Sequence, residues 1–262
     1  MSSHVLDYHI YGDDIQYVEI GLDPRETVIS EAGAMMMMTE GIQMETIFGD
    51  GSSQGGTSFV DKLFGAGKRV LTGESLFMTA FTNTSFVKQQ VSFAAPYPGK
   101  IIPMDLSLMS GKLICQKDAF LCAAKGVSIG IDFRKKLSVG FFGGEGFILE
   151  KLEGEGLAFI HACGAICKKE LAPGERLKVD TGCLVAMNRD VHYDIEMVRG
   201  VKNALFGGEG LFLATLTGPG IVWLQSLPFN RLAGKILSVG GARGTGRREE
   251  SGLLGGIGNF FD

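Results

Sequence analysis

The segment FGGEGLFLATLTGPGIVWLQSLP, at residues 206–228, is the part of this chain that most clearly indicates its fold class. Residues 210–229 carry no charge over twenty positions, which is the length of a membrane-spanning helix. Gly218, Pro219 and Gly220 interrupt the run, and Gly and Pro between two short apolar segments favour a tight turn. We therefore predict a buried hairpin with the strands FLATL and IVWLQ, and no transmembrane segment.

Two markers recur three times, in a fixed order, along the 262 residues. The first is a proline turn, found at Pro24-Arg25-Glu26, Pro98-Gly99-Lys100 and Pro173-Gly174-Glu175. The second opens an apolar run and is found at Gly73-Glu74, Gly144-Glu145 and Gly208-Glu209. The prolines are 74 and 75 residues apart, so we interpret the chain as one supersecondary unit used three times.

The repeating unit is built from strands. Apolar residues alternate in short segments, as at Leu177 and Val179, and glycine interrupts the chain too often for long helices. We predict an all-β chain of three tandem β-sandwich units with one or two short helices, at residues 59–71 and 227–237. The predicted boundaries are 1–95 for the first unit, with a Gly-rich insertion at 49–67, 96–170 for the second, 171–238 for the third, and 239–262 for a Gly-rich tail.

The PGE turn, the FGGEG-apolar-GxG pattern and the strand MMMM resemble the altered inheritance of mitochondria protein 24 family, formerly domain of unknown function 124, over residues 10–240. The resemblance implies three copies of a small sandwich similar to the trp RNA-binding attenuation protein subunit, a short double-stranded β-helix. It also implies a homotrimer in which nine such units form a ring. The family has no established catalytic residues, and Pro98-Gly99-Lys100 departs from its turn pattern.

Charge argues against nucleic acid as a partner. The chain has 25 Lys+Arg and 29 Asp+Glu, a formal charge of −4, and ring recognition of RNA needs repeated basic and aromatic residues on one rim. The basic clusters at 134–136, 168–169 and 247–248 lie at non-equivalent repeat positions. The N-terminal residues lack a signal-peptide pattern and the five cysteines are an odd number, so we expect a cytoplasmic protein with reduced thiols.

Metal binding is the strongest chemical alternative. His161, Cys163, Cys167, Cys183 and His192 offer imidazole and thiolate ligands of the kind that zinc prefers. The H-x-C-x₃-C spacing is not a usual zinc pair, and buried cysteines are common for packing reasons alone. We therefore favour structural thiols and predict no metal and no cofactor.

Other candidate sites are weaker. Gly67-Lys68 is followed by Arg69 and lacks the Ser or Thr of a phosphate-binding loop. The repeated glutamates Glu74, Glu145 and Glu209 favour turn carboxylates over an acid–base pair, because equivalent repeat positions do not converge on one pocket. For Met35–Met38 we favour core packing over an adaptable binding surface.

These observations predict a non-catalytic, ring-forming scaffold or partner-binding protein whose protein partner is unknown. The alternative is a ring that binds a small ligand or nucleic acid. A cupin-like metal-dependent enzyme is the third choice, because its fold is related but its site needs clustered histidines, and the chain has only four.

Overall fold

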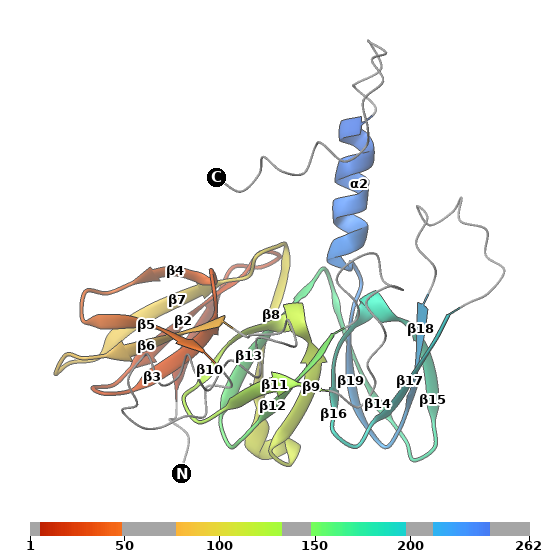
Figure 1. Cartoon of the computed structure of the whole chain (residues 1–262), viewed down its shortest axis with the longest axis horizontal. Coiled ribbons are helices and arrows are strands. Elements are labelled where there is room, and N and C mark those ends of the chain that lie inside the picture. Colours follow the sequence, from red (N-terminus) through yellow and green to blue (C-terminus); the bar gives the residue numbers. More distant parts are fainter. Residues whose placement is uncertain (1–5, 49–76, 133–147, 198–211, 242–262) are drawn as a thin grey trace. The chain divides into compact units, whose positions relative to one another are not determined.

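The computed structural model describes residues 6–48, 77–132, 148–197 and 212–241. It divides into two compact units, Met1–Pro228 and Phe229–Asp262. The first unit is built from antiparallel strands, so the all-β prediction is confirmed (Figure 1). The second contains helix α2 (Phe229–Gly241), which overlaps the helix predicted at 227–237.

Nineteen strands make up the described part of the first unit. The early strands are β1 (Asp7–Tyr11), β2 (Tyr17–Leu22), β3 (Thr27–Glu31), β4 (Met35–Met38), β5 (Ile42–Phe48), β6 (Phe77–Asn83) and β7 (Gln89–Ala94). The middle strands are β8 (Gly99–Asp105), β9 (Lys112–Gln116), β10 (Phe120–Ala124), β11 (Ser128–Ile131), β12 (Leu149–Glu153) and β13 (Leu157–Cys163). The last are β14 (Ile166–Leu171), β15 (Arg176–Asp180), β16 (Leu184–Asn188), β17 (His192–Met197), β18 (Phe212–Thr217) and β19 (Gly220–Gln225).

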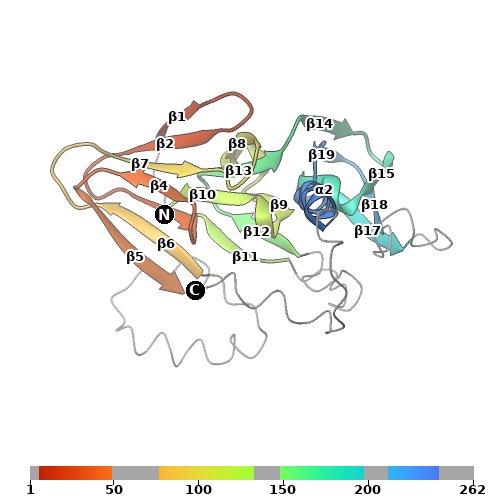
Figure 2. The same cartoon turned by 90° about the horizontal axis from the view of Figure 1, so that it is seen from above.

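The strands after β1 fall into three groups of six with one pairing pattern. We call β2–β7, β8–β13 and β14–β19 the first, second and third repeat. In each repeat the sixth strand pairs with the first and the third, and the fifth strand pairs with the second and the fourth. Each repeat thus supplies two three-stranded groups, and β1 adds to the edge of the first repeat beside β2, as Figure 2 shows.

Neighbouring repeats are joined by sheet pairing. The second strand of one repeat pairs antiparallel with the third strand of the next, through β3 with β10 and through β9 with β16. We call these contacts the first and the second joint. They produce two six-stranded sheets, β5-β6-β3-β10-β13-β8 and β11-β12-β9-β16-β19-β14. Each of these sheets therefore contains half of one repeat and half of the next.

The third strand of every repeat carries an irregularity at the same place. The register against the sixth strand shifts between Met35 and Met37 in β4. It shifts in the same way between Phe120 and Cys122 in β10, and between Leu184 and Ala186 in β16. A β-bulge at one position in three repeats gives a common landmark for comparing them.

Buried apolar side chains of neighbouring repeats share a core, as Leu121 and Phe159 of the second repeat do with the first. In the first repeat the ring of Phe81 on β6 packs edge-on against Phe93 on β7, with centroids 5.3 Å apart. Burial alternates along β2, because only one of its faces is covered, whereas all of β10 is buried. The joint strand β10 is therefore covered on both faces.

The predicted hairpin of FLATL and IVWLQ is wrong, although both segments are strands. β18 pairs with β15 and β17, whereas β19 pairs with β14 and β16, so the connection crosses from one sheet to another. Gly218 is required in this crossing, because a Cβ there would lie 2.4 Å from the carbonyl oxygen of Ala172. No helix in the described residues is long and apolar enough to cross a membrane.

Candidate functional site

Two strands of the types that form the joints lie at sheet edges, at the ends of the series of repeats. In the four-stranded sheet β1-β2-β7-β4, one of the two edge strands is β4, the third strand of the first repeat. In the three-stranded sheet β15-β18-β17, one of the two edge strands is β15, the second strand of the third repeat. These are the strand types that form the first and second joints. The described part of the chain thus contains two closed joints and the two separate halves of a third.

The open edge of β4 is apolar and exposed. Met36 has 51% of its surface exposed, whereas Leu121 and Val185, at the same position in β10 and β16, are each 1% exposed. All four residues of β4 are exposed methionines, so the predicted core packing of Met35–Met38 is wrong. The physical reason is that no strand in the described residues pairs with the outer side of β4, while β10 and β16 have β3 and β9 there.

The open edge strand β15 carries both apolar and charged side chains. Val179 faces the core and is 8% exposed, while Arg176 and Lys178 point to the surface. The Lys178 ammonium lies 2.6 Å from Glu196 Oε1 on β17. At the position of Lys178 the two joints carry buried isoleucines, Ile29 and Ile114. Edge strands with lysine are less prone to uncontrolled pairing than uncharged ones.

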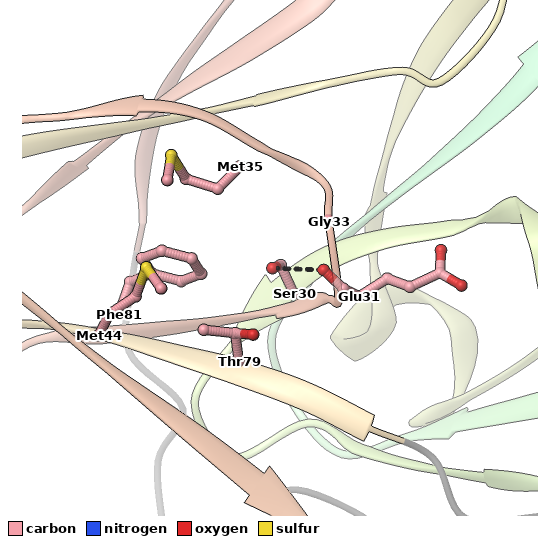
Figure 3. A pocket seen from close by; sticks show the side chains of 7 residues that line it. All are labelled: Ser30, Glu31, Gly33, Met35, Met44, Thr79 and Phe81. Carbon is pink, nitrogen blue, oxygen red and sulfur yellow. Dashed lines mark hydrogen bonds between the residues drawn. The ribbon is translucent and has the colours of Figure 1, made fainter. Parts of the chain in front are cut away.

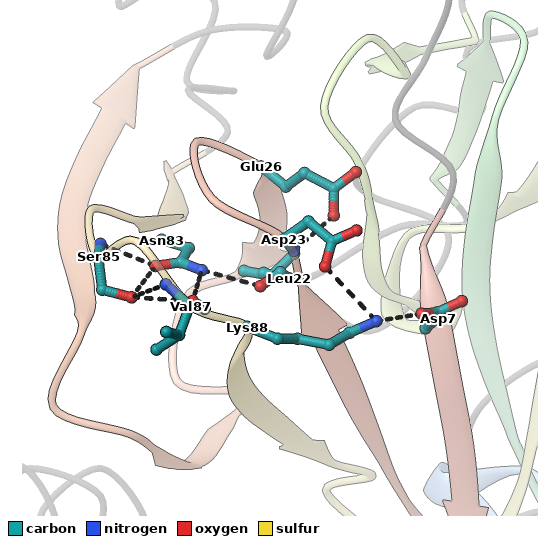
Figure 4. Close-up of polar contacts among 8 residues, drawn as sticks. All are labelled: Asp7, Leu22, Asp23, Glu26, Asn83, Ser85, Val87 and Lys88. Atoms are coloured by element: carbon teal, nitrogen blue, oxygen red, sulfur yellow. Dashed lines mark hydrogen bonds and ion pairs between the residues drawn. The ribbon is translucent and has the colours of Figure 1, made fainter.

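The proline turns at Pro24 and Pro173 have the same geometry. The Asp23 amide donates to Glu26 Oε2 at 2.8 Å, as Figure 4 shows, and the Ala172 amide donates to Glu175 Oε2 at 2.8 Å. The residue after each proline has a left-handed backbone, with φ 71° at Arg25 and 79° at Gly174. Both glutamates therefore close a tight turn between the first and second strands of their repeats.

Pro98 and Gly99 lie in a different connection. Gly99 begins β8, so this segment links the first repeat to the second, whereas Pro24 and Pro173 lie within a repeat. A Cβ on Gly99 would lie 1.8 Å from the carbonyl oxygen of Ala162 on the paired strand β13, so glycine is required there for close backbone approach. By strand pairing the third repeat begins with β14 at Ile166, whereas the sequence places the boundary between 170 and 171.

The second markers lie outside the described residues. They are Gly73, Glu74, Gly144, Glu145, Gly208 and Glu209. The apolar runs that follow them end in β6, β12 and β18, which are the fifth strands of the three repeats. The helix predicted at 59–71, the insertion at 49–67 and the tail beyond 241 also lie outside the described residues.

A polar network stabilises the first repeat beside the Glu26 turn (Figure 4). Asn83 Nδ2 donates to the carbonyl oxygens of Leu22 at 2.9 Å and Val87 at 2.8 Å. Lys88 pairs with Asp7 on β1 and lies 3.6 Å from Asp23. Both groups connect backbone segments that lie far apart in the sequence, which is a structural role. Sequence reasoning missed Asn83 because a lone asparagine after an apolar run predicts only a turn.

The candidate metal ligands are not brought together. His161 and Cys163 are buried on β13, Cys167 is exposed on β14, and Cys183 is half-buried between β15 and β16. His192 is exposed at the start of β17. Within the described ranges no group of three or more His, Cys, Asp or Glu side chains could hold a metal ion. Burial lowers the pKa of His161 to about 4 and leaves the ring neutral against Tyr97, with ring centroids 4.7 Å apart.

Acidic groups are concentrated at the first joint. Burial and then Asp118 raise the pKa of Glu31, the last residue of β3, to about 7. Burial and then Glu31 raise the pKa of Glu150 on β12 to about 8, and Lys117 opposes both shifts. Glu150 is 2% exposed. The end of one repeat thus lies in the electrostatic field of the next.

The second joint has an uncharged contact at the same place. Gln116 is the last residue of β9, as Glu31 is of β3. Its Nε2 donates to the carbonyl oxygen of Thr181 at 3.0 Å, in the short 3₁₀ turn Thr181–Cys183 of the third repeat. In both joints, therefore, the last residue of a second strand interacts with the following repeat, through charge at Glu31 and through a hydrogen bond at Gln116.

A cavity of about 150 Å³ lies in the first repeat at the corresponding place (Figure 3). It is lined by Ser30, Glu31, Gly33, Met35, Met44, Thr79 and Phe81. Ser30 Oγ donates to the carbonyl oxygen of Glu31 at 2.9 Å, and the Glu31 carboxylate points away from the methionines in Figure 3. The first repeat has a two-residue turn here, where the later repeats have 3₁₀ turns, and a Cβ on Gly33 would meet no atom within 4 Å.

Known proteins match the chain over its whole strand-built part. An uncharacterized protein of Streptococcus pyogenes serotype M6 is 30% identical over 222 residues, which are 84% of this chain and 84% of that protein. A crystal structure of a protein from Streptococcus pyogenes has 25% sequence identity and a TM-score of 0.68, and the match covers 89% of this chain and 99% of that one. The family model described as Mitochondrial biogenesis AIM24 matches residues 8–227, which span all three repeats. The resemblance inferred from the repeated markers is thereby confirmed, and the chain belongs to the Mitochondrial biogenesis AIM24 family.

Proposed function

We propose that this protein is a non-catalytic scaffold that works as a closed ring of three copies. Its repeats would be sandwich units of the type found in the trp RNA-binding attenuation protein, and its biological partner would be another protein bound by the assembled ring. The proposal places it in the cytoplasm, where the five cysteine thiols stay reduced.

One observation carries the proposal: β4 and β15 are the two halves of a joint that the chain closes twice elsewhere. Exposed apolar sheet edges are association sites unless a neighbouring strand covers them. A head-to-tail contact that uses two different surfaces gives either a closed ring or an open filament. A ring pairs every β4 with a β15, whereas a filament leaves one of each uncovered at its two ends, which favours the ring for a protein with an uncharged edge such as β4.

The absence of catalysis is supported by where the titratable groups lie. Glu150 and His161, whose pKa values are strongly shifted, are buried in the strands at and beside the first joint. Burial between packed strands keeps such groups away from a substrate, whereas catalytic acids and bases need to reach one. Strongly shifted pKa values also occur in structural clusters.

Light scattering of the purified protein tests the proposal. The expected mass is about 84 kDa, three times the 28.0 kDa of one chain, and a monomer at micromolar concentration would contradict it. Two further measurements separate the scaffold from the alternatives. Elemental analysis for zinc, iron and nickel should find no stoichiometric metal, and RNA should cause no salt-dependent mobility shift.

A further inference from the structure

We infer that β15 of one chain pairs antiparallel with β4 of a second copy in one defined register. The pairing places Val179 opposite Met37, Lys178 opposite Met38 and Leu177 opposite Thr39. The inference rests on the proposed function and deepens it, because it names the partner strand and the residues that meet. The result would be one seven-stranded sheet, β17-β18-β15-β4-β7-β2-β1, shared by two chains.

The register follows from the two joints inside the chain. In the first joint the pairs are Ser30 with Cys122, Ile29 with Ala123 and Val28 with Ala124. In the second they are Cys115 with Ala186, Ile114 with Met187 and Leu113 with Asn188. The fourth residue of each second strand thus lies opposite the residue that follows the bulge in each third strand. The same rule applied to β15 and β4 pairs Val179 with Met37.

The bulge in β4 does not prevent this pairing. A bulge or a charge on an edge strand usually blocks addition of another strand. β10 and β16 have a bulge at the same position and still pair with β3 and β9. β4 carries neither charge nor proline, and its four side chains are exposed. The edge of β4 therefore has the same backbone irregularity as β10 and β16, which each accept a neighbouring strand.

The cavity of the first repeat lies where β15 of the partner copy would end. In the second joint the last residue of β9, Gln116, donates to the carbonyl oxygen of Thr181 in the turn that precedes β16. Asp180 is the last residue of β15, and the turn that precedes β4 contains Gly33. The open space beside Gly33 and the roughly 150 Å³ beside Thr79 leave room for a side chain from outside. A second copy is thus the occupant that fits both the edge and the cavity.

Disulfide cross-linking tests the register. The aligned variants are Val179→Cys with Met37→Cys, and Lys178→Cys with Met38→Cys, each in a background with Cys167→Ser and Cys183→Ser. Residues directly opposite in antiparallel strands have Cα atoms about 4.5–5.5 Å apart, which suits a disulfide. The control is Leu177→Cys with Met37→Cys, a diagonal pair about 7–8 Å apart, which is too far. The probe is mild oxidation followed by non-reducing electrophoresis.

We expect both aligned variants to give covalent dimers and trimers, and the diagonal control at least tenfold less. A mixture of chains that carry only Met37→Cys with chains that carry only Val179→Cys should cross-link between the two types, which shows that the bond joins different copies. Circular dichroism confirms that each variant folds. If the protein has the mass of a trimer but the diagonal pair links as well as the aligned pairs, or no pair links, the inference is wrong and the scaffold proposal stands. A monomeric mass contradicts the scaffold proposal itself.

Discussion

The third residue of the second strand differs between the two joints and the open edge strand β15. Ile29 and Ile114 fill it in the joints and are buried, whereas Lys178 fills it in β15. The Lys178 ammonium is held by Glu196, so its aliphatic stem remains available to cover a neighbouring apolar side chain. A lysine here gives less apolar contact than isoleucine. The contact between copies should therefore be weaker than the two joints within the chain.

Replacing Lys178 by isoleucine should strengthen assembly. Burial of an isoleucine side chain contributes about 1.5–3 kcal/mol, so we expect the concentration at which the oligomer dissociates to fall by at least about tenfold. Sedimentation or light scattering over a dilution series measures this concentration. Lys169→Ile, on the exposed strand β14, is the matched control and should leave it unchanged. A Lys178→Ile protein that dissociates more readily would contradict the position assigned to Lys178.

The buried carboxyl of Glu150 should make stability fall with increasing pH. Its folded pKa of about 8 lies above the ordinary 4.5, so the folded chain holds more protons than the unfolded chain between these values. Stability from this group is therefore fully present below pH 4.5 and is lost as pH rises through 8. His161 acts in the opposite direction between about 4 and 6.5, because its pKa is lowered. Between pH 6.5 and 8, therefore, the pH dependence of stability reflects the buried carboxyls and not His161.

Glu150→Gln should flatten the pH dependence in that window and raise stability at pH 8 by on the order of 2 kcal/mol. Urea unfolding at three pH values measures the change. Glu153→Gln on the same strand is the control, because hydrogen bonds from Lys112 and Lys151 lower the pKa of Glu153. That substitution should reduce stability at neutral pH. If the free energy of unfolding of the Glu150→Gln protein depends on pH as strongly as that of the original, ionisation of Glu150 does not destabilise the folded chain.

At the scale of single elements, the turns closed by Glu26 and Glu175 offer a paired test. Both glutamates accept a backbone hydrogen bond of 2.8 Å in the same turn of different repeats. A net hydrogen bond of this kind contributes about 0.5–1.5 kcal/mol. Glu26→Ala and Glu175→Ala should each lower the free energy of unfolding by about 1 kcal/mol, measured by urea titration, while Glu155→Ala at an exposed turn should not. Clearly unequal losses would contradict an equivalent role.

Local pattern identified the strands but not their neighbours. FLATL and IVWLQ are strands as predicted, because short apolar runs bounded by Gly and Pro carry that information. Their assignment to one hairpin failed, since a local run does not reveal whether the chain folds back or crosses to the facing sheet. The prediction that Met35–Met38 pack in the core was wrong for a related reason. The apolar composition of this strand predicts burial, yet within the described ranges no strand covers its outer side.

At the scale of the whole molecule, the strand pairing repeats three times, but the proline markers of the sequence do not fall at the same place in every repeat. Pro24 and Pro173 occupy one turn and Pro98 another, because glycine and proline serve several kinds of turn. The joints could not be predicted from sequence at all. β3 and β10 are separated by more than eighty residues, and strand register depends on which faces are buried after the chain has folded.

Head-to-tail assembly through one pair of edges makes a prediction that other modes of association do not. A bulky maleimide-polyethylene glycol attached at Met38→Cys blocks β4 and leaves β15 open, and the same label at Lys178→Cys does the reverse. Both variants carry Cys167→Ser and Cys183→Ser, which remove the thiols that are not buried.

Each labelled protein alone should be a monomer, because every contact needs both edges. Mixed one to one, they should form a dimer of two 28.0 kDa chains plus labels and nothing larger, because the one free β4 and the one free β15 satisfy each other. The same label at Lys169→Cys should leave the full oligomer intact. Trimers that persist when either edge is blocked would show that the copies meet through some other surface.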